Sequence, residues 1–130
     1  MSKSDYLEVE VLKWCTGQSN ALGTAPTPYI GLYTANPTDA GGGTEVSGGS
    51  YARVSSAGKW GVPSAGSVSN NAEIAFTTAS ANWGTVTGFG LFDASGGGNL
   101  LRWASLSASK AVESGDTARF ATSTITFTED

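Results

Sequence analysis

From residue 29 onward, the chain repeats one pattern: a short run of alternating apolar and polar residues, then a cluster of glycine, serine, asparagine or proline. Alternation with a period of two is typical of strands with one buried face, and the intervening residue types favour turns. The 18 glycines have no period of three, which excludes a collagen-like helix. The pattern predicts strands at residues 29–34, 51–55, 72–77, 85–93, 100–104 and 118–128.

The clearest hairpin is predicted from residues 85–93 and 100–104, which the glycine-rich run 95–99 separates. Within the first of these strands, Gly88 and Gly90 lie on the same face. Glycine inside a strand indicates a β-bulge or an aromatic ring lying over the backbone. The second strand is therefore expected to return antiparallel to the first.

Two longer stretches, 39–50 and 56–71, are rich in glycine and serine and are predicted as loops. Six or seven short strands joined by turns predict a mainly β fold. We expect an antiparallel β-sandwich of the jelly-roll kind, or a partly open barrel, with one short N-terminal α-helix.

The helix is predicted just after Ser4, whose side chain can cap the first turn. Asp5 lies in that turn, where a negative charge is favourable. One apolar stripe follows at helical spacing. It consists of Leu7, Val11, Trp14 and Cys15.

This helix has two interpretations. It can close one end of the domain's own core, with Cys15 as a small buried side chain. Alternatively, residues 1–28 form an attachment arm that packs on a partner, and residues 29–130 form the β-sandwich domain. The candidate partner contacts are Tyr6, Leu7, Val11, Trp14 and Cys15.

The absence of histidine excludes the histidine-dependent triads and histidine ligands for zinc. The single cysteine cannot form an intrachain disulfide or a CxxC site. We expect no enzymatic activity and no catalytic, metal-binding or cofactor-binding residues.

Charge and hydropathy limit the partners further. The net charge is −4, which disfavours binding to nucleic acid phosphates. No apolar run approaches the roughly 20 residues of a membrane span, so no membrane contact is expected. The first five residues lack the basic start and apolar core of a signal peptide, and we expect none there.

The acidic residues give only weak indications of a functional site. Asp93 and Asp116 adjoin turns, where aspartate commonly accepts backbone N–H bonds. Paired carboxylates can cleave glycosides, but the sequence indicates neither a cleft nor a defined separation. Asp39 and Glu45 lie in a glycine-rich loop and leave calcium as an alternative, although EF-hand spacing is absent.

Trp60 and Trp83 lie in predicted loops with polar surroundings, and they are the candidate surface aromatic contacts for sugars. Packing in a core is the alternative, because tryptophan is heavily buried on average.

Several blocks of sequence carry a family resemblance. They are residues 4–8 (SDYLE), 29–39, 45–54, 83–93 and 97–101. Their order and spacing resemble a family of small tailed-phage virion proteins, whose members are often labelled tail fibre proteins. The resemblance implies a virion structural component without enzymatic activity.

Two positions on the particle compete. A head decoration or cement protein would form an oligomer, expected to be a trimer, on the major capsid protein. The alternative is a collar, baseplate or tail-fibre module that contacts host glycans. Since fibre shafts usually show long repetitive segments and this chain has none, we expect the capsid exterior, after assembly in the host cytoplasm. A free carbohydrate-binding module is a third hypothesis, which the absence of a secretion signal disfavours.

Overall fold

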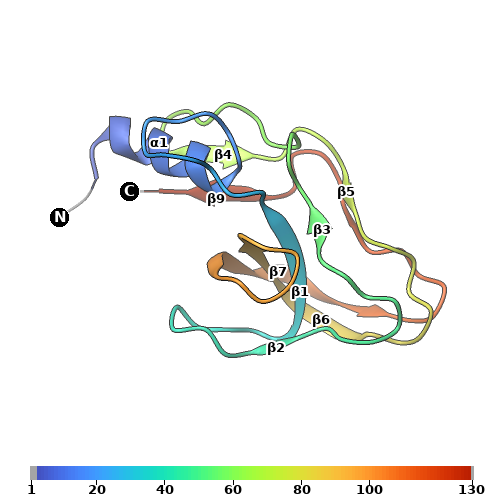
Figure 1. Ribbon diagram of the computed structural model, residues 1–130. Helices are drawn as coiled ribbons and strands as arrows, with labels where there is room; N and C mark the ends of the chain where they lie inside the picture. The colour runs from blue at the N-terminus through green and yellow to red at the C-terminus, as the bar shows by residue number, and fades with distance from the viewer. Residues whose placement is uncertain (1–2, 130) are drawn as a thin grey trace. The chain divides into compact units, whose positions relative to one another are not determined.

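The computed structural model describes residues 3–129 of the chain. Antiparallel strands predominate in it, and one short helix lies near the N-terminus (Figure 1). The prediction of a mainly β fold with one short helix is confirmed. Among the described residues, no sheet closes into a barrel.

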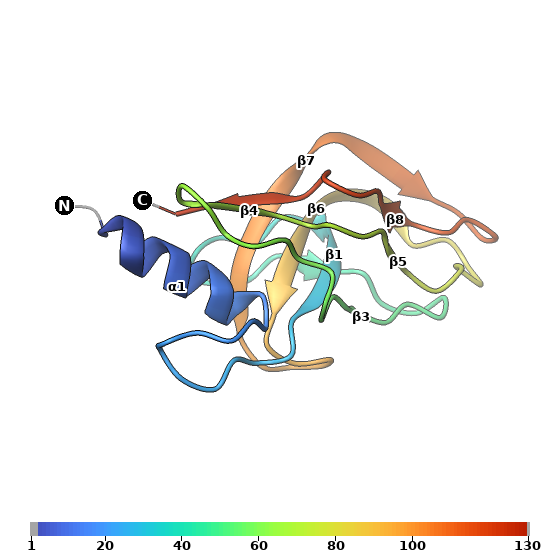
Figure 2. The ribbon, with the colours of Figure 1, turned by 90° about the horizontal axis from the view of Figure 1, so that it is seen from above.

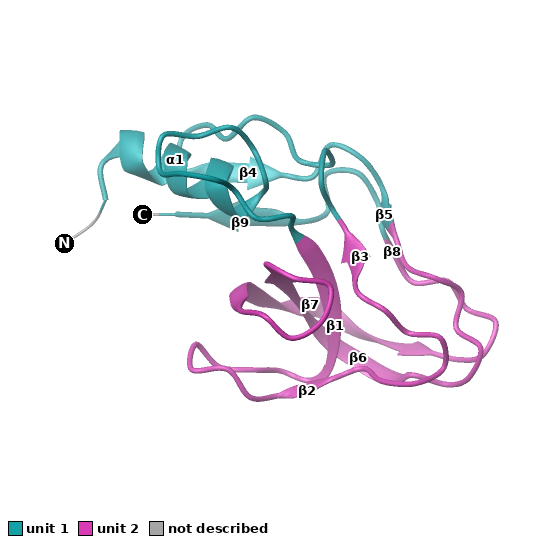
Figure 3. Cartoon of the chain, viewed as in Figure 1, with its two compact units in different colours: residues 1–28, 56–74, 120–130 teal, residues 29–55, 75–119 magenta. Residues whose placement is uncertain are grey.

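The chain divides into two compact units, shown in separate colours in Figure 3. Unit 1 consists of Met1–Pro28, Ser56–Ile74 and Phe120–Asp130, and unit 2 consists of Tyr29–Ser55 and Ala75–Arg119. The division into an arm at residues 1–28 and a β domain at 29–130 stays a prediction. Met1, Ser2 and Asp130, at the outer ends of those ranges, lie outside the described residues.

Unit 2 is built on a five-stranded antiparallel sheet. Its strands lie in the order β2-β1-β6-β7, and β3 also pairs with β1. Figure 1 shows β1, β6 and β7 side by side. The strands are β1 (Tyr29–Ala35), β2 (Thr44–Glu45), β3 (Val54–Ser55), β6 (Gly84–Phe92) and β7 (Leu100–Val112).

Glycines make room on one face of this sheet. Gly31 of β1 lies opposite Gly90 of β6, which lies opposite Trp103 of β7. A Cβ atom at Gly90 would lie 3.0 Å from the ring of Phe92 and 3.1 Å from that of Tyr33. The prediction of aromatic rings over this strand is therefore confirmed.

The predicted bulge is also present, and it is larger on β7 than on β6. Val86 pairs with Lys110 and Gly88 pairs with Ser105, so residues 106–109 of β7 lie opposite Thr87 alone. The ladder between the two strands is locally interrupted there.

Aromatic side chains also pack beside the sheet in unit 2. The Trp83 ring meets Tyr51 edge-on, with the centroids 5.3 Å apart, and it also meets Phe76 edge-on. Its indole N–H donates to the Gly49 carbonyl at 2.9 Å. This packing fixes the glycine-rich loop before Tyr51.

Unit 1 combines α1 (Asp5–Cys15) with the antiparallel pair β4 (Ser67–Ser69) and β9 (Thr126–Thr128). Ser4 caps the helix, as predicted: its hydroxyl accepts the Leu7 N–H. Figure 2 shows α1 next to the strand pair. The buried apolar side chains of this unit include Leu12, Cys15, Trp60, Val68, Ile125 and Phe127.

A buried asparagine connects the segments of unit 1. Asn70 is 1% exposed, and its amide NH2 donates to the carbonyls of Ala72 and Ala121 at 2.9 and 3.0 Å. Its side-chain oxygen accepts the N–H of Ile125 at 2.9 Å. The Asn70 side chain therefore supplies hydrogen bonds to backbone groups that no regular strand pair binds, where the chain near residue 70 meets the last segment.

The buried face of α1 differs from the predicted stripe. Its buried residues are Glu8, Glu10, Leu12 and Cys15. Leu7, Val11 and Trp14 are half-buried instead. Gly66, just before β4, explains part of the shift: a Cβ atom there would lie 2.9 Å from the Glu8 carboxylate, so glycine lets Glu8 face this segment.

Some strand predictions need correction. The predicted strand at 118–128 is divided into β8 (Arg119–Phe120) and β9, because Asn70 and a turn hold the residues between them. The predicted loops contain the short strands β2 and β4, and β7 runs to Val112 rather than residue 104. β5 (Ile74–Ala75) pairs with β8, and each of these two strands crosses a boundary between the units.

Candidate functional site

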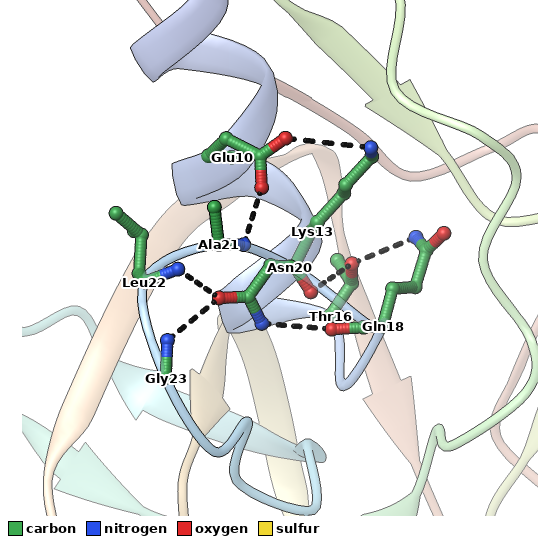
Figure 4. A network of polar contacts seen from close by, with 8 residues as sticks. All are labelled: Glu10, Lys13, Thr16, Gln18, Asn20, Ala21, Leu22 and Gly23. Atoms are coloured by element: carbon green, nitrogen blue, oxygen red, sulfur yellow. Dashed lines mark hydrogen bonds and ion pairs between the residues drawn. The ribbon is translucent and has the colours of Figure 1, made fainter.

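A polar network holds the loop after α1 against the helix in unit 1 (Figure 4). The buried Glu10 carboxylate accepts the Ala21 N–H at 2.7 Å, and its other oxygen lies 3.5 Å from the Lys13 ammonium. This contact draws the loop onto the side of the helix that carries Glu10.

Two amide side chains complete the network. The Asn20 oxygen accepts the N–H groups of Leu22 and Gly23, at 2.8 and 3.1 Å. The Gln18 amide donates to the Thr16 hydroxyl at 2.9 Å and to the Gly61 carbonyl at 3.0 Å. The loop is thereby tied both to itself and to the segment around Gly61.

The network lies next to the strongly exposed apolar side chains of unit 1. Tyr6 is 65% exposed, Leu22 50% and Val62 81%. Tyr6 lies one helical turn before Glu10, Leu22 follows Ala21, and Val62 follows Gly61. We call these three side chains the helix–loop surface. The network binds the Leu22 N–H and the Gly61 carbonyl, so ordering these two segments when a partner binds would cost little.

The candidate partner contacts on α1 fall into three groups. Tyr6 is exposed, whereas Leu7, Val11 and Trp14 are half-buried, with the Trp14 indole donating to the Thr24 carbonyl at 3.2 Å. The prediction of Cys15 as a partner contact is corrected, because its side chain is buried within the chain itself. Leu22 and Val62 were missed, because a single apolar residue in a loop gives no periodic signal.

Trp60 and Trp83 need correction as surface contacts, since each is only 5% exposed. Trp60 donates to the Ser56 hydroxyl at 3.0 Å, and its ring lies 5.3 Å from that of Phe127. Trp83 packs edge-on against both Tyr51 and Phe76, and those two rings also stack on each other. Both lie in irregular segments, but local aromatic packing covers their rings.

The second polar constellation lies in unit 2, above Gly31. The Arg53 guanidinium donates two hydrogen bonds to the Glu45 carboxylate, each at 2.9 Å. The Tyr51 hydroxyl donates to the same carboxylate at 2.6 Å and accepts the Leu32 N–H. We call Glu45, Tyr51 and Arg53 the Arg53 cluster.

Arg53 also reaches the hairpin between β6 and β7. Its remaining nitrogen donates to the carbonyls of Ala94 and Gly97, at 3.0 and 2.9 Å. The guanidinium lies 3.5 Å from the centre of the Phe92 ring, which is a favourable position for a cation. One side chain thus fixes the β2 end of the long loop and the β6–β7 hairpin together.

The charges of the Arg53 cluster stabilise one another. Burial of Glu45 opposes its ionisation, but the hydrogen bonds from Arg53 and Tyr51 outweigh burial and lower the Glu45 pKa. The hydrogen bond to Glu45 raises the pKa of Arg53. Burial and the neighbouring carboxylate raise the pKa of Tyr51 above its ordinary range. Glu45 is therefore held as a carboxylate by its own neighbours.

The two turn aspartates have the predicted role. Asp93 accepts the Asn99 backbone N–H at 2.7 Å and its side-chain amide at 2.9 Å. The backbone hydrogen bond from Asn99, followed by the side-chain one, lowers the Asp93 pKa. Asp116 accepts the Glu113 N–H at 2.9 Å.

The other acids of the glycine-rich loop have protein partners too. Asp39 accepts the indole N–H of Trp103, and Glu45 belongs to the Arg53 cluster. Within residues 3–129, no group of three or more acidic or cysteine side chains is arranged to hold a metal ion. None of the helical residues described forms a stretch long and apolar enough to span a membrane.

The antiparallel sheets, glycine-rich turns and one short helix of the described residues define a small, mainly β protein. A family model described as podophage GP4 fiber I protein gp80 matches residues 2–128, and the chain belongs to this family. The membership confirms the resemblance to phage virion structural proteins. None of the curated proteins searched matches the chain.

Proposed function

We propose that the chain is a non-enzymatic component of the fibres of a podophage tail, attached through the helix–loop surface. The observation that carries this proposal is the match to the fiber I family over residues 2–128. The fiber description favours the tail-fibre alternative over head decoration.

The chemistry of unit 2 supports a structural role. Asp93 and Asp116 bind turns, Asp39 accepts the Trp103 N–H, and Glu45 binds Arg53. Each of these contacts stabilises the fold. We propose accordingly that the chain carries no catalytic group, as expected from its lack of histidine.

The helix–loop surface supports attachment to another virion protein or to further copies of the chain. Its three large apolar side chains lose unfavourable contact with water when a partner covers them. The network of Figure 4 already fixes the loop that carries Leu22, so ordering this loop on binding would cost little. We propose that this surface, with the half-buried Leu7, Val11 and Trp14 beside it, forms the attachment site.

The position on the particle is tested by gold-labelled antibodies against the chain on purified virions. We expect label on the tail fibres. Label on the capsid shell would favour the head-decoration alternative and contradict the proposal. Absence of the chain from purified particles would contradict any virion role.

Attachment is tested with the combined variant Tyr6→Ser, Leu22→Ser and Val62→Ser. We expect its share in purified virions to fall at least tenfold, while its circular dichroism matches that of the parent chain. The matched control, Ala108→Ser with Ala111→Ser, changes exposed residues of unit 2 and should be incorporated normally. Normal incorporation of the triple variant would contradict attachment through this surface.

Self-association is tested by native mass spectrometry of the purified chain. We expect a homo-oligomer, with the trimer as the specific expectation, and dissociation in the triple variant. A monomer at all accessible concentrations would contradict homo-oligomerisation and leave another virion protein as the partner of this surface.

A further inference from the structure

Trp103 differs from the two buried tryptophans. It lies on β7 in unit 2, is half-buried, and directs its indole N–H to the carboxylate of the exposed Asp39 at 3.1 Å. In contrast, Trp60 and Trp83 are covered by neighbouring rings. Trp103 therefore combines a partly exposed aromatic side chain with a polar edge next to an exposed carboxylate.

A second contact holds the loop after β1 near Trp103. Asn36 donates to the Ser105 hydroxyl at 2.9 Å and accepts from the Thr87 hydroxyl at 2.9 Å. The sheet provides space for it at Gly88, where a Cβ atom would collide with the Asn36 side chain. Since Gly88 pairs with Ser105, the asparagine lies across β6 and reaches β7.

The register places these groups together. Trp103 lies opposite Gly90 and Ser105 opposite Gly88, so both project from the same face of the sheet. Asp39 and Asn36 are three residues apart on the loop, and each is bonded to one of these β7 side chains. The resulting patch presents an aromatic ring, a carboxylate, an amide and two hydroxyls in one fixed arrangement.

We propose that the patch formed by Asn36, Asp39, Thr87, Trp103 and Ser105 binds an uncharged saccharide. The indole face can stack on the C–H groups of a sugar ring, and a carboxylate accepts hydrogen bonds from adjacent sugar hydroxyls. One Asp39 oxygen accepts the Trp103 N–H, which leaves the other to accept such bonds. The hydroxyls of Thr87 and Ser105 can both donate and accept.

The charge of the chain selects against acidic sugars. Asp39 is negative and exposed, and the net charge is −4, so a uronic or sialic acid would be repelled. The site thus favours neutral sugars, as in the uncharged parts of bacterial surface polysaccharides. This inference rests on the proposed fibre function for its biological setting, although saccharide binding can be measured on the isolated chain.

The test follows the four tryptophan indole N–H signals in a nitrogen–proton correlation spectrum of the full chain. The probes are methyl glycosides of glucose, galactose, mannose and rhamnose, together with N-acetylglucosamine, and glucuronic acid is the acidic comparison. We expect a neutral sugar to move the Trp103 signal progressively, with the other three unchanged. Glucuronic acid should have at least tenfold weaker affinity.

Two variants locate the site. Trp103→Ala and Asp39→Asn should each weaken binding at least tenfold, measured by isothermal titration calorimetry because Trp103→Ala removes the reporting indole signal. Asp39→Asn keeps a side-chain oxygen for the Trp103 N–H, which preserves the local structure. The matched control is Glu113→Gln, which removes a negative charge from another exposed residue of unit 2. It should bind as the parent does.

The inference is overturned if no neutral sugar moves the Trp103 signal, or if both site variants bind like the parent. It is also overturned if a purified virion protein moves that signal and no sugar does, because the patch is then a protein contact. If antibodies label the fibres but no sugar binds the chain, the saccharide inference is contradicted and the proposed function is retained. Sugar binding by a chain absent from virions would refute the proposed function alone.

Discussion

Irregular backbone segments are bound by a neutral side chain in unit 1 and by a charged side chain in unit 2. In unit 1, the neutral amide of Asn70 binds the carbonyls of Ala72 and Ala121. In unit 2, the charged Arg53 binds the carbonyls of Ala94 and Gly97. Each side chain satisfies backbone groups of an irregular segment that has no strand partner at those positions.

The difference lies in what each side chain needs in return. Asn70 is nearly fully buried and needs no counter-charge. Only 9% of the Arg53 side chain is exposed, so its positive charge needs a carboxylate nearby, and Glu45 supplies one. Unit 1 should therefore be insensitive to charge at this position, whereas unit 2 should depend on the ionisation of Glu45.

The largest effect is expected from Arg53→Ala. The change leaves Glu45 without its counter-charge and two carbonyls without donors, and we expect the free energy of unfolding to fall by about 3 kcal/mol. This value is at the low end for buried pairs, since 26% of the Glu45 side chain is exposed. Denaturant titration measures it. Lys110→Ala removes an exposed charge from β7 and should change stability by less than about 0.5 kcal/mol. Equal effects of the two variants would contradict the role of the cluster.

Asn70→Ala should be the next most damaging change. It deprives two carbonyls and one N–H of partners, and we expect a loss of about 2 kcal/mol. The neighbouring Asn71→Ala is the matched control, because that side chain is exposed. Hydrogen exchange should show faster exchange of the Ile125 amide in the first variant only. An unchanged Ile125 amide would show that the hydrogen bond at Asn70 contributes little.

Gly31→Ala tests the space beneath the Arg53 cluster. The new methyl group would lie 2.8 Å from a Glu45 oxygen and 2.9 Å from the Phe92 ring, and both can shift slightly. We expect a loss of about 1 kcal/mol by thermal unfolding. Gly96→Ala, with open space around its Cβ position, should be neutral. If Gly31→Ala were as stable as Gly96→Ala, the cluster would be looser than these distances indicate.

The smallest effect is a pH dependence confined to unit 2. The pKa of Glu45 is lower in the folded chain than the ordinary value of 4.5, so ionisation of Glu45 stabilises the fold. This contribution is fully present above that value and is lost as the pH falls through the lower folded pKa. Amide exchange near Ala94 and Gly97 should accelerate in acid, whereas exchange near Asn70 should not follow the same titration.

Two variants assign this pH dependence. Glu45→Gln should be less stable at neutral pH and should have a flatter acid profile than the parent. Asp93 also has a lowered pKa and contributes in the same direction, so Asp93→Asn measures its separate share. A parent-like acid profile in Glu45→Gln would assign the effect to other carboxylates.

The sequence predicted most reliably where one periodic signal matched one element. Strands β1 and β6 are rich in apolar residues and each contains a run of consecutive buried residues, and Ser4 caps the helix as its position indicates. The serine- and alanine-rich second half of β7 has no such run, since most of its side chains are exposed. Its pairing with β6 is set by the neighbouring strand rather than by its own residues.

The site residues were harder to predict, for a related reason. Glu45 and Arg53 have opposite charges near the ends of one glycine-rich segment, which is a weak signal for an ion pair. The contact of Arg53 with Ala94 and Gly97 joins residues about 40 positions apart, and backbone acceptors leave no mark in the sequence. The burial of Trp60 and Trp83 likewise depends on the rings of Phe127 and Tyr51, which are distant from them in the chain.

The interruption at residues 106–109 bears on how molecules of the protein associate through the edge of this sheet. β7 is at the end of its sheet's strand order, and the edge of a long regular strand can recruit the same strand from another molecule and begin a fibril. Residues 106–109 break the regular spacing of backbone donors and acceptors along that edge. We expect a deletion that restored regular pairing there to make the chain more prone to amyloid-like aggregation.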